Sequence, residues 1–427
     1  MKILFRGGAR EVGRSCIEVR SDNSKILLDC GVKLSEDNPE YPILDKLYID
    51  AVFISHAHLD HTGSLPILSH LGMHCPVYAT SMTRALSREL LKDSLKIGIE
   101  EHRELPFNKG DITKIIHHHK NVDYRKKYTK KDFEYTYFDA GHIPGSASIY
   151  LNYNNGKRIL YTGDIKLSKT RLTKGADLSY CDNDIDVLII ESTYGNQNHP
   201  DRKQLEKEFL NKVQETIERG GTAIIPAFAV DRSQEAILML NNLELDTPIY
   251  FDGLGTKITR IMLKQHPKYL RNHKKLKRAF SNTYVVENED RHYVIKDLKE
   301  NGGVVVSTAG MLNGGPVIKY ISNFWDDPKS SLIFTGYQVK NTAGRILLET
   351  GKLPIGEMLI EPKFEISFYE FSAHAGMDEL RTVVKNVNPE KLIIQHGDDE
   401  PVNVFKEWAI NEGFNTYAPE LGDIVKI

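Results

Sequence analysis

The segment ISHAHLDHTGSLP (54–66) places four residues that can bind transition metals within six positions. They follow the apolar run YIDAVFIS and are His56, His58, Asp60 and His61. His56 and His58 are two positions apart in an extended segment and can therefore face the same side. Asp60 and His61 stand where a helix is expected to begin, and a helix N-terminus tolerates a carboxylate. One loop thus offers two pairs of ligands, which predicts two metal ions that each need about two more ligands.

Three further candidate ligands follow apolar strands elsewhere in the chain. His142 lies in DAGHIPGSAS, Asp164 ends LYTGD, and His396 lies in IIQHGDDE. A carboxylate has two oxygens, so Asp164 can serve both metals. The first site would take His56, His58, His142 and Asp164, and the second would take Asp60, His61, Asp164 and His396. Such nitrogen-rich sites with few ligands favour zinc, so we expect two zinc ions per chain and a hydroxide between them at neutral pH.

The elements that position these residues indicate two domains. Before about residue 190 the sequence predicts mainly strands and turns, with a helical pattern near 82–94. From about 200, short apolar strands alternate with helices, which predicts βαβ units and a parallel sheet. Strands return after about 356. We therefore expect a β-rich domain formed by residues 1–195 and 356–427, interrupted by an inserted α/β domain at 196–355.

Composition narrows the class of protein. Of the 427 residues, 40% are hydrophobic and 27% are charged, which is typical of a globular protein, and the net charge of −2 does not by itself indicate nucleic acid. The longest apolar runs fall well short of the roughly 20 residues that span a bilayer, so no membrane association is expected. The start, MKILFRGGAREVG, lacks the pattern of a signal peptide. Four cysteines without metal-knuckle spacing are expected to be free thiols in a reducing, cytoplasmic setting.

Several of these motifs together resemble a known superfamily. HAHLDH, with Asp29 in LLDCG, His142 in AGHIPGS and Asp164 in YTGD, resembles the metallo-β-lactamase superfamily. The resemblance implies a four-layer αββα sandwich with the metals at one edge of its two sheets. It also implies that Asp29 does not bind the metals itself but holds in place the loop that carries their ligands.

The second half of the chain resembles the β-CASP nucleases of that superfamily, and the resemblance covers essentially the whole chain. The motifs that carry it are IIESTYG, PAFAVDRSQE, STAGMLNGGP, GYQVKNTAGR, FSAHAG and QHGDDE. The fold implied is a metallo-β-lactamase sandwich with an inserted Rossmann-like β-CASP domain. Glu191, His374 and His396 match the three motifs that the subfamily adds. Asp231 departs from the pattern, because the family usually has glycine there.

The resemblance implies a zinc-dependent ribonuclease, since family members that cut RNA have histidine at the position of His396. FSAH and SHAHLDH are more similar to the endonuclease subunit of cleavage and polyadenylation specificity factor and its archaeal relatives than to RNase J. His374 would protonate the departing sugar oxygen and Glu191 would hold its ring. Asp164 would also be able to take a proton from the attacking water. Products would carry a 5′-phosphate and a 3′-hydroxyl.

Contacts to single-stranded RNA are expected from two basic stretches, at 120–131 and 264–278. They include Lys126, Lys127, Lys274 and Lys275, which would bind phosphates without regard to sequence. Ser307 and Ser372 could place hydroxyls near phosphates.

Alternatives remain open at this point. Within nucleases they are endonucleolytic cleavage in RNA 3′-end processing or decay, 5′→3′ exonucleolytic cleavage as in RNase J, and DNA as substrate. Outside nucleases they are a thioesterase-like hydrolase, which would not need the insertion, and a non-catalytic scaffold of an RNA-processing complex. Relatives dimerise partly through the C-terminal end, so a homodimer is one expectation here. Other RNA-processing or exosome-type partners cannot be named from the sequence. The high Lys, Ile and Glu content fits an archaeal source.

Overall fold

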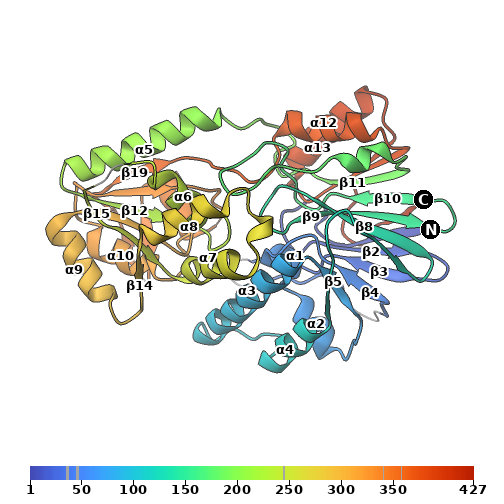
Figure 1. Cartoon of the computed structure of the whole chain (residues 1–427), viewed down its shortest axis with the longest axis horizontal. Coiled ribbons are helices and arrows are strands. Elements are labelled where there is room, and N and C mark those ends of the chain that lie inside the picture. Colours follow the sequence, from blue (N-terminus) through green and yellow to red (C-terminus); the bar gives the residue numbers. More distant parts are fainter. Residues whose placement is uncertain (35–37, 45–47, 244–245, 340, 357) are drawn as a thin grey trace. The chain divides into compact units, whose positions relative to one another are not determined.

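The computed structural model describes residues 1–34, 38–44, 48–243, 246–339, 341–356 and 358–427. The chain forms two compact units. Unit 1 comprises Met1–Lys169, Thr173–Asn198 and Ala373–Ile427, and unit 2 comprises Thr170–Leu172 and His199–Ser372. The second unit is thus inserted into the sequence of the first, and Figure 1 colours its residues from green to orange.

Unit 1 contains two seven-stranded sheets. The first has the order β22-β1-β2-β3-β4-β5-β6, with bounds Ile424–Lys426, Lys2–Gly7, Cys16–Arg20, Lys25–Leu28, Ala51–Phe53, Val77–Ala79 and His119–Asn121. The second has the order β21-β20-β11-β10-β9-β8-β7, with bounds Thr416–Tyr417, Lys391–Gln395, Val187–Glu191, Arg158–Tyr161, Ala147–Tyr153, Phe133–Asp139 and Lys127–Lys130. Because β22 pairs with β1, the two ends of the chain lie side by side (Figure 1).

Helices cover the outer faces of both sheets, so unit 1 has four layers. Their bounds are α1 Leu59–Thr62, α2 Leu65–His70, α3 Ser81–Glu100, α4 Lys109–His117, the 3₁₀ turn η1 Ser179–Asp182, α12 Met377–Val387 and α13 Asp399–Asn411. Leu27 and Val52 of the first sheet pack with Leu68 of α2, and Leu188 of the second packs with Leu380 of α12. Figure 1 shows α2, α3 and α4 beside β4 and β5, and α12 and α13 beside β10 and β11. The expected αββα sandwich is confirmed.

The strand β20 shows how the sequence forms this sandwich. Successive side chains of a strand point to opposite faces of its sheet. Ile393 lies in the core between the two sheets, whereas Leu392 and Ile394 pack toward the outer helices. Both faces are therefore buried, which is why this strand is a continuous apolar run.

Unit 2 is built on a parallel six-stranded sheet with the order β14-β13-β15-β12-β16-β19. These strands span Tyr284–Val286, Ile249–Asp252, Gly303–Ser307, Thr222–Pro226, Ser331–Phe334 and Glu365–Phe368. Its helices are α5 Arg202–Glu218, α6 Arg232–Leu240, α7 Leu254–Gln265, the 3₁₀ turn η2 Pro267–Tyr269, α8 His273–Ser281, α9 Arg291–Asn301, α10 Val317–Phe324 and α11 Ala343–Thr350. A small hairpin, β17 Leu353–Ile355 and β18 Met358–Ile360, follows α11.

One expected domain boundary differs from the structure. The sequence suggested a return to the first domain at residue 356, but the return lies after Ser372. The reason is strand β19, which pairs in parallel with β16 and thereby extends the inserted sheet. The expected first boundary, after residue 195, lies close to the observed one after Asn198. Among the residues that the structure describes, no helix is long and apolar enough to cross a membrane.

Candidate metal centre

The ligand loop 54–63 is anchored by a single buried carboxylate, that of Asp29. The backbone N–H and the hydroxyl of Ser55 donate to its two oxygens, each at 2.7 Å. Nδ1 of His61 and the hydroxyl of Tyr161 donate to the Asp29 Oδ2 atom, at 2.7 and 2.6 Å. Both ends of the loop are therefore tied to Asp29. Gly31 lets the loop approach closely, because a Cβ there would stand 1.6 Å from the carbonyl oxygen of Asp60.

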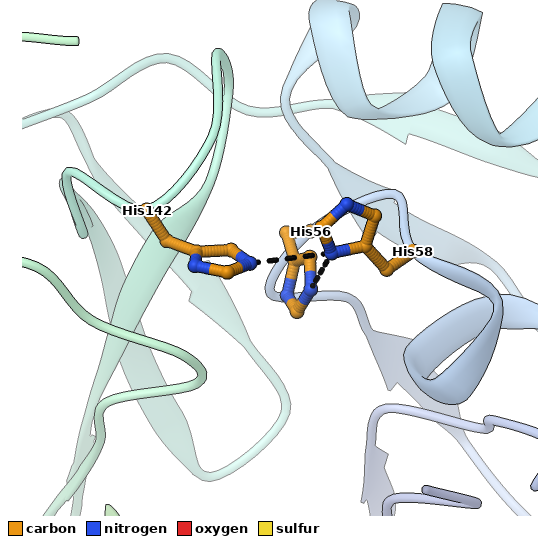
Figure 2. A group of neighbouring side chains, drawn as sticks. All are labelled: His56, His58 and His142. Atoms are coloured by element: carbon orange, nitrogen blue, oxygen red, sulfur yellow. Dashed lines mark hydrogen bonds between the residues drawn. The ribbon is translucent and has the colours of Figure 1, made fainter. Parts of the chain in front are cut away.

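A first group of ligands converges at the end of strand β4. Nε2 of His56 and Nε2 of His142 each lie 3.2 Å from Nδ1 of His58 (Figure 2). Burial lowers the pKa of His56 and of His142 well below the usual range of histidine. Burial also lowers the pKa of His58, to about 4. All three imidazoles are therefore neutral at pH 7, which is the form that binds a metal.

A second group consists of Asp60, His61, Asp164 and His396. Nε2 of His61 lies 3.8 Å from Oδ2 of Asp60, and Nε2 of His396 lies 3.6 Å from the same oxygen. Although burial opposes the shift, the carboxylate of Asp164 raises the pKa of His61 well above its usual value, and it also raises the pKa of His396. This group thus combines two carboxylates with two imidazoles.

Asp164 stands between the two groups, with one oxygen toward each. Its Oδ2 lies 3.5 Å from Nε2 of His56 and 3.6 Å from Nε2 of His142. Its Oδ1 lies 3.3 Å from Nε2 of His61 and 3.4 Å from Nδ1 of His396. Tetrahedral zinc with bonds of 2.0–2.1 Å requires ligand atoms about 3.3 to 3.4 Å apart.

Three atoms that face the second group are buried without a hydrogen-bond partner among the described residues. They are Nε2 of His61, Oδ1 of Asp164 and Nε2 of His396. Buried polar groups normally have a hydrogen-bond partner, so three neighbouring polar atoms without one need an explanation. A bound cation would supply the missing partner. The donor set and its spacing therefore fit a bound metal ion at the second group, and His56, His58 and His142 offer a further set of ligands beside it.

His374 lies beside this centre and is held by Glu191. Its Nδ1 lies 3.1 and 3.0 Å from the two oxygens of Glu191, which is itself fully buried. Burial opposes protonation of His374, but the charges of Glu191 and Asp164 outweigh it and raise its pKa to about 9. The side chain keeps 21% of its surface exposed. The contact with Glu191 therefore favours the protonated imidazole, and solvent can reach the ring.

Parallel strands explain why these distant residues meet. β10, β11 and β20 run in parallel beside one another, and their carboxyl ends lie at one edge of the sheet. Asp164, Glu191 and His396 come at or just after these ends. Ligands and catalytic groups collect at such an edge because the loops leave the sheet there.

Comparison with known proteins shows the family to which the chain belongs. The family models that match are "Beta-Casp domain" at residues 233–347, "Zn-dependent metallo-hydrolase RNA specificity domain" at 360–419 and "Anti-Pycsar protein Apyc1" at 13–214. A protein of Methanocaldococcus jannaschii called "Probable RNase MJ4" is 53% identical over 430 residues and is covered completely, as is this chain. The chain belongs to the β-CASP ribonucleases of the metallo-β-lactamase superfamily. The resemblance inferred from its motifs is thereby confirmed.

More distant relatives of this β-CASP ribonuclease carry related names. "RNase aCSPSF2" of Saccharolobus solfataricus is 38% identical, with 100% of this chain and 85% of that protein covered. "Transcription termination factor FttA" of Methanosarcina mazei is 36% identical, with 94% and 67% covered. Among solved structures, a protein of unknown function from Enterococcus faecalis V583 has a TM-score of 0.62 at 14% identity, with 99% of both chains covered, which shows the shared fold.

Asp231, where the sequence departs from the family's glycine, caps helix α6 of the β-CASP unit. Its φ of 75° lies in the left-handed region that glycine adopts most easily. The side chain is buried and forms an ion pair with Arg232, while its backbone N–H donates to the side chain of Gln234 at 2.7 Å. The aspartate therefore adopts a backbone conformation that suits glycine, and it adds a charge that Arg232 balances.

The two basic stretches expected to contact RNA differ in how many of their charges have acidic partners. In the first basic stretch, Arg125 pairs with Asp177 at 2.6 Å, Lys127 with Glu134 at 3.1 Å and Lys131 with Asp50 at 2.5 Å. Acidic partners thus neutralise part of that stretch, although Lys126 and Lys127 are exposed.

The second stretch, 264–278, lies within a longer segment that has no acidic residues. The segment 253–286, which contains α7 and α8, has no Asp or Glu and nine basic residues: Lys257, Arg260, Lys264, Lys268, Arg271, Lys274, Lys275, Lys277 and Arg278. Lys274 and Lys275 are exposed on α8. A whole chain with a net charge of −2 therefore carries one concentrated basic segment.

The two candidate serines are placed differently. Ser307 ends β15, is fully buried, and its hydroxyl donates to the carbonyl of Thr308 at 3.4 Å. This placement does not favour contact between Ser307 and a phosphate. Ser372 is half-buried at the end of unit 2.

Sequence reasoning missed the residues that hold the site together. Ser55 and Tyr161 bind Asp29, and Lys166 donates to the carbonyl of His374 at 2.9 Å. Ser55 directly precedes His56, Tyr161 lies within the LYTGD motif, and Lys166 follows Asp164 by two positions, so position near a ligand was the available signal.

Asp29→Asn is expected to weaken zinc binding by about 10- to 100-fold, because supports of metal ligands have effects of that size. The amide would present N–H donors to groups that already donate to Asp29. Competition with a chromophoric chelator measures the affinity, and Asp22→Asn, an exposed aspartate of the same unit, is the control. Wild-type affinity in Asp29→Asn would show that Asp29 does not support the ligand loop.

Proposed function

We propose that this chain is a zinc-dependent ribonuclease that hydrolyses RNA phosphodiesters to 5′-phosphate and 3′-hydroxyl products. The observation that carries the proposal is the position of Asp164, with one carboxylate oxygen toward each of two ligand groups. Two zinc ions would be held by His56, His58, His142 and Asp164, and by Asp60, His61, Asp164 and His396. When bound, such a pair supplies an activated water and neutralises phosphate charge.

The proposed proton donor is His374. Because its Nδ1 faces Glu191, Nε2 is the nitrogen that would give a proton to the departing oxygen. The attacking water would give a proton to the carboxylate of Asp164 as its oxygen bonds to phosphorus. The bond from phosphorus to the 3′ oxygen breaks, and that oxygen takes the proton of His374. Glu191 keeps the ring charged and oriented. Its carboxylate is itself held in place, because Oε1 also accepts a hydrogen bond from the backbone N–H of Ile165 at 2.8 Å.

We propose endonucleolytic cleavage of single-stranded RNA, in 3′-end processing or decay. Support comes from the similarity to "RNase aCSPSF2" and to the termination factors called FttA. A relative called "RNase J-like protein" is 37% identical, so 5′→3′ exonucleolytic cleavage is the second outcome that the test must resolve.

The test uses RNA with a 5′-monophosphate, labelled at either the 5′ or the 3′ end, incubated with the protein and zinc. Fragments of internal length from both labels support an endonuclease. Mononucleotide from the 5′ label, together with progressively shortened 3′-labelled RNA, means a 5′→3′ exonuclease. His56→Ala is the control, because it removes one ligand. If wild type and His56→Ala are equally inactive, the proposed nuclease function is wrong and a scaffold role gains support.

Removing two charges from α8 is expected to weaken RNA binding in a salt-dependent way. Each phosphate contact on a single strand contributes about 0.7 to the slope of log affinity against log salt, so Lys274→Ala with Lys275→Ala should reduce that slope by about 1.4. Filter binding at several salt concentrations measures it. The control is Lys203→Ala with Lys207→Ala, two exposed lysines on α5 of the same unit. An unchanged slope would contradict RNA contact at α8.

A further inference from the structure

The segment directly after Asp164 lies against the loop that carries His374. The backbone N–H of Ala375 donates to the carbonyl of Ile165 at 2.6 Å. The side-chain ammonium of Lys166 donates to the carbonyl of His374 at 2.9 Å. Two neighbouring backbone groups of the His374 loop are thus held by two neighbouring residues of unit 1.

The ammonium of Lys166 is itself confined. Lys166 is 7% exposed, and its Nζ also lies 3.5 Å from Oε2 of Glu379, in the first turn of α12. Its backbone is fixed as well, since its N–H donates to the carbonyl of Ala140 and its carbonyl accepts from the N–H of Ala176. A buried cation is costly unless it is paired and hydrogen-bonded. Here its partners are a carboxylate and the peptide of His374.

Glu191 and Lys166 hold His374 at two different places. Glu191 contacts the ring at Nδ1, which fixes the direction of the imidazole. It does not fix the peptide from which the ring extends. The carbonyl of Ala373 accepts from Nδ1 of His142 at 2.9 Å, so the peptide before His374 is also in contact with a ligand side chain. Lys166 holds the peptide after it.

We propose that Lys166 is a positioning residue for His374, which it holds through the backbone carbonyl in the orientation needed to protonate the leaving oxygen. The inference rests on the proposed role of His374 as proton donor. Without the ammonium, the peptide after His374 keeps only the hydrogen bond from the Ala375 N–H to the carbonyl of Ile165, and the imidazole is held less firmly. A displacement of about 1 Å in a reacting group can lower the rate by about 100-fold.

A leaving-group comparison tests this role. One RNA carries an ordinary linkage at the cleavage site, and the other has sulfur in place of the bridging 3′ oxygen. An oxygen must be protonated as the bond to phosphorus breaks, whereas sulfur departs as a stable thiolate and needs no proton. A defect in proton donation therefore slows only the oxygen substrate, while a defect in folding, metal binding or RNA binding slows both.

Lys166→Met is expected to lower the single-turnover rate on the oxygen substrate by roughly 10- to 100-fold and to leave the sulfur substrate unchanged. Its zinc content and its binding of RNA should equal those of wild type. Lys166→Arg, which keeps a cationic donor, should recover most of the rate. Lys391→Met is the matched control, because Lys391 also donates to a backbone carbonyl, that of Lys426 at 2.7 Å, at the other end of β20 from His396.

Two results would overturn the inference: equal slowing of both substrates by Lys166→Met, or no slowing of either. If Lys166→Met does not fold, Glu379→Gln replaces it. That change leaves the ammonium with a weaker partner and should slow the oxygen substrate alone. His374→Ala separates the two proposals. If His374→Ala slows both substrates equally, the proposed acid role is wrong. If it slows only the oxygen substrate while Lys166→Met slows both, only the positioning role is wrong.

Discussion

Asp164→Asn is expected to bind at most one zinc ion per chain and to lose activity on the order of 1,000-fold. Asparagine has nearly the same volume, but one of the two oxygens becomes an amide nitrogen that cannot bind a cation. Because one oxygen faces His56 and His142 and the other faces His61 and His396, either orientation of the amide deprives one group of its anionic ligand. Removal of one preorganised electrostatic group at a reacting centre costs up to about 10³ in rate.

Zinc content after dialysis, measured by mass spectrometry, and single-turnover cleavage of RNA together check this expectation. Asp111→Asn is the matched control, since Asp111 is also buried in unit 1 but caps helix α4. Two zinc ions with an unchanged rate in Asp164→Asn would show that this carboxylate does not serve both groups. One zinc ion with full activity would show that a single metal is sufficient.

The sequence was most informative where ligands follow strands. HAHLDH predicted two pairs of ligands, and the structure brings each pair together with partners from distant segments. His142, Asp164 and His396 were identifiable because each follows an apolar strand. The carboxyl ends of parallel neighbours such as β10, β11 and β20 necessarily meet at one edge.

What the sequence could not supply are contacts between segments far apart in the chain. Tyr161 binds Asp29 across 132 positions, and Lys166 reaches the carbonyl of His374 across 208. The return to unit 1 was placed too early because the pairing of β19 with β16 is invisible in local patterns. Charge runs are equally ambiguous, since Lys131 of the first basic stretch is paired with Asp50.

The second large effect is expected from His374→Ala. This variant should retain both zinc ions and lose roughly 100-fold or more in the rate of RNA cleavage, which is the usual contribution of a general acid. Single-turnover cleavage and zinc content are the measurements, and His117→Ala, an exposed histidine of the same unit, is the control.

The zinc content of His374→Ala decides whether His374 is a metal ligand or the proton donor, because its position in the structure allows both roles. His142, Asp164 and His374 form a third group whose ligand atoms all lie within 4.8 Å of one another, so His374 is positioned where it could bind a metal. Its Nδ1, however, is 3.9 Å from Asp164 but only 3.0 and 3.1 Å from the two oxygens of Glu191. A carboxylate at Nδ1 supports metal-binding histidines as well, as Asp29 does for His61, so the contact with Glu191 leaves Nε2 of His374 available for either role. Loss of one zinc ion in His374→Ala would therefore assign His374 to the metal and remove it as the proton donor, whereas an inactive variant with both ions leaves proton transfer as its role.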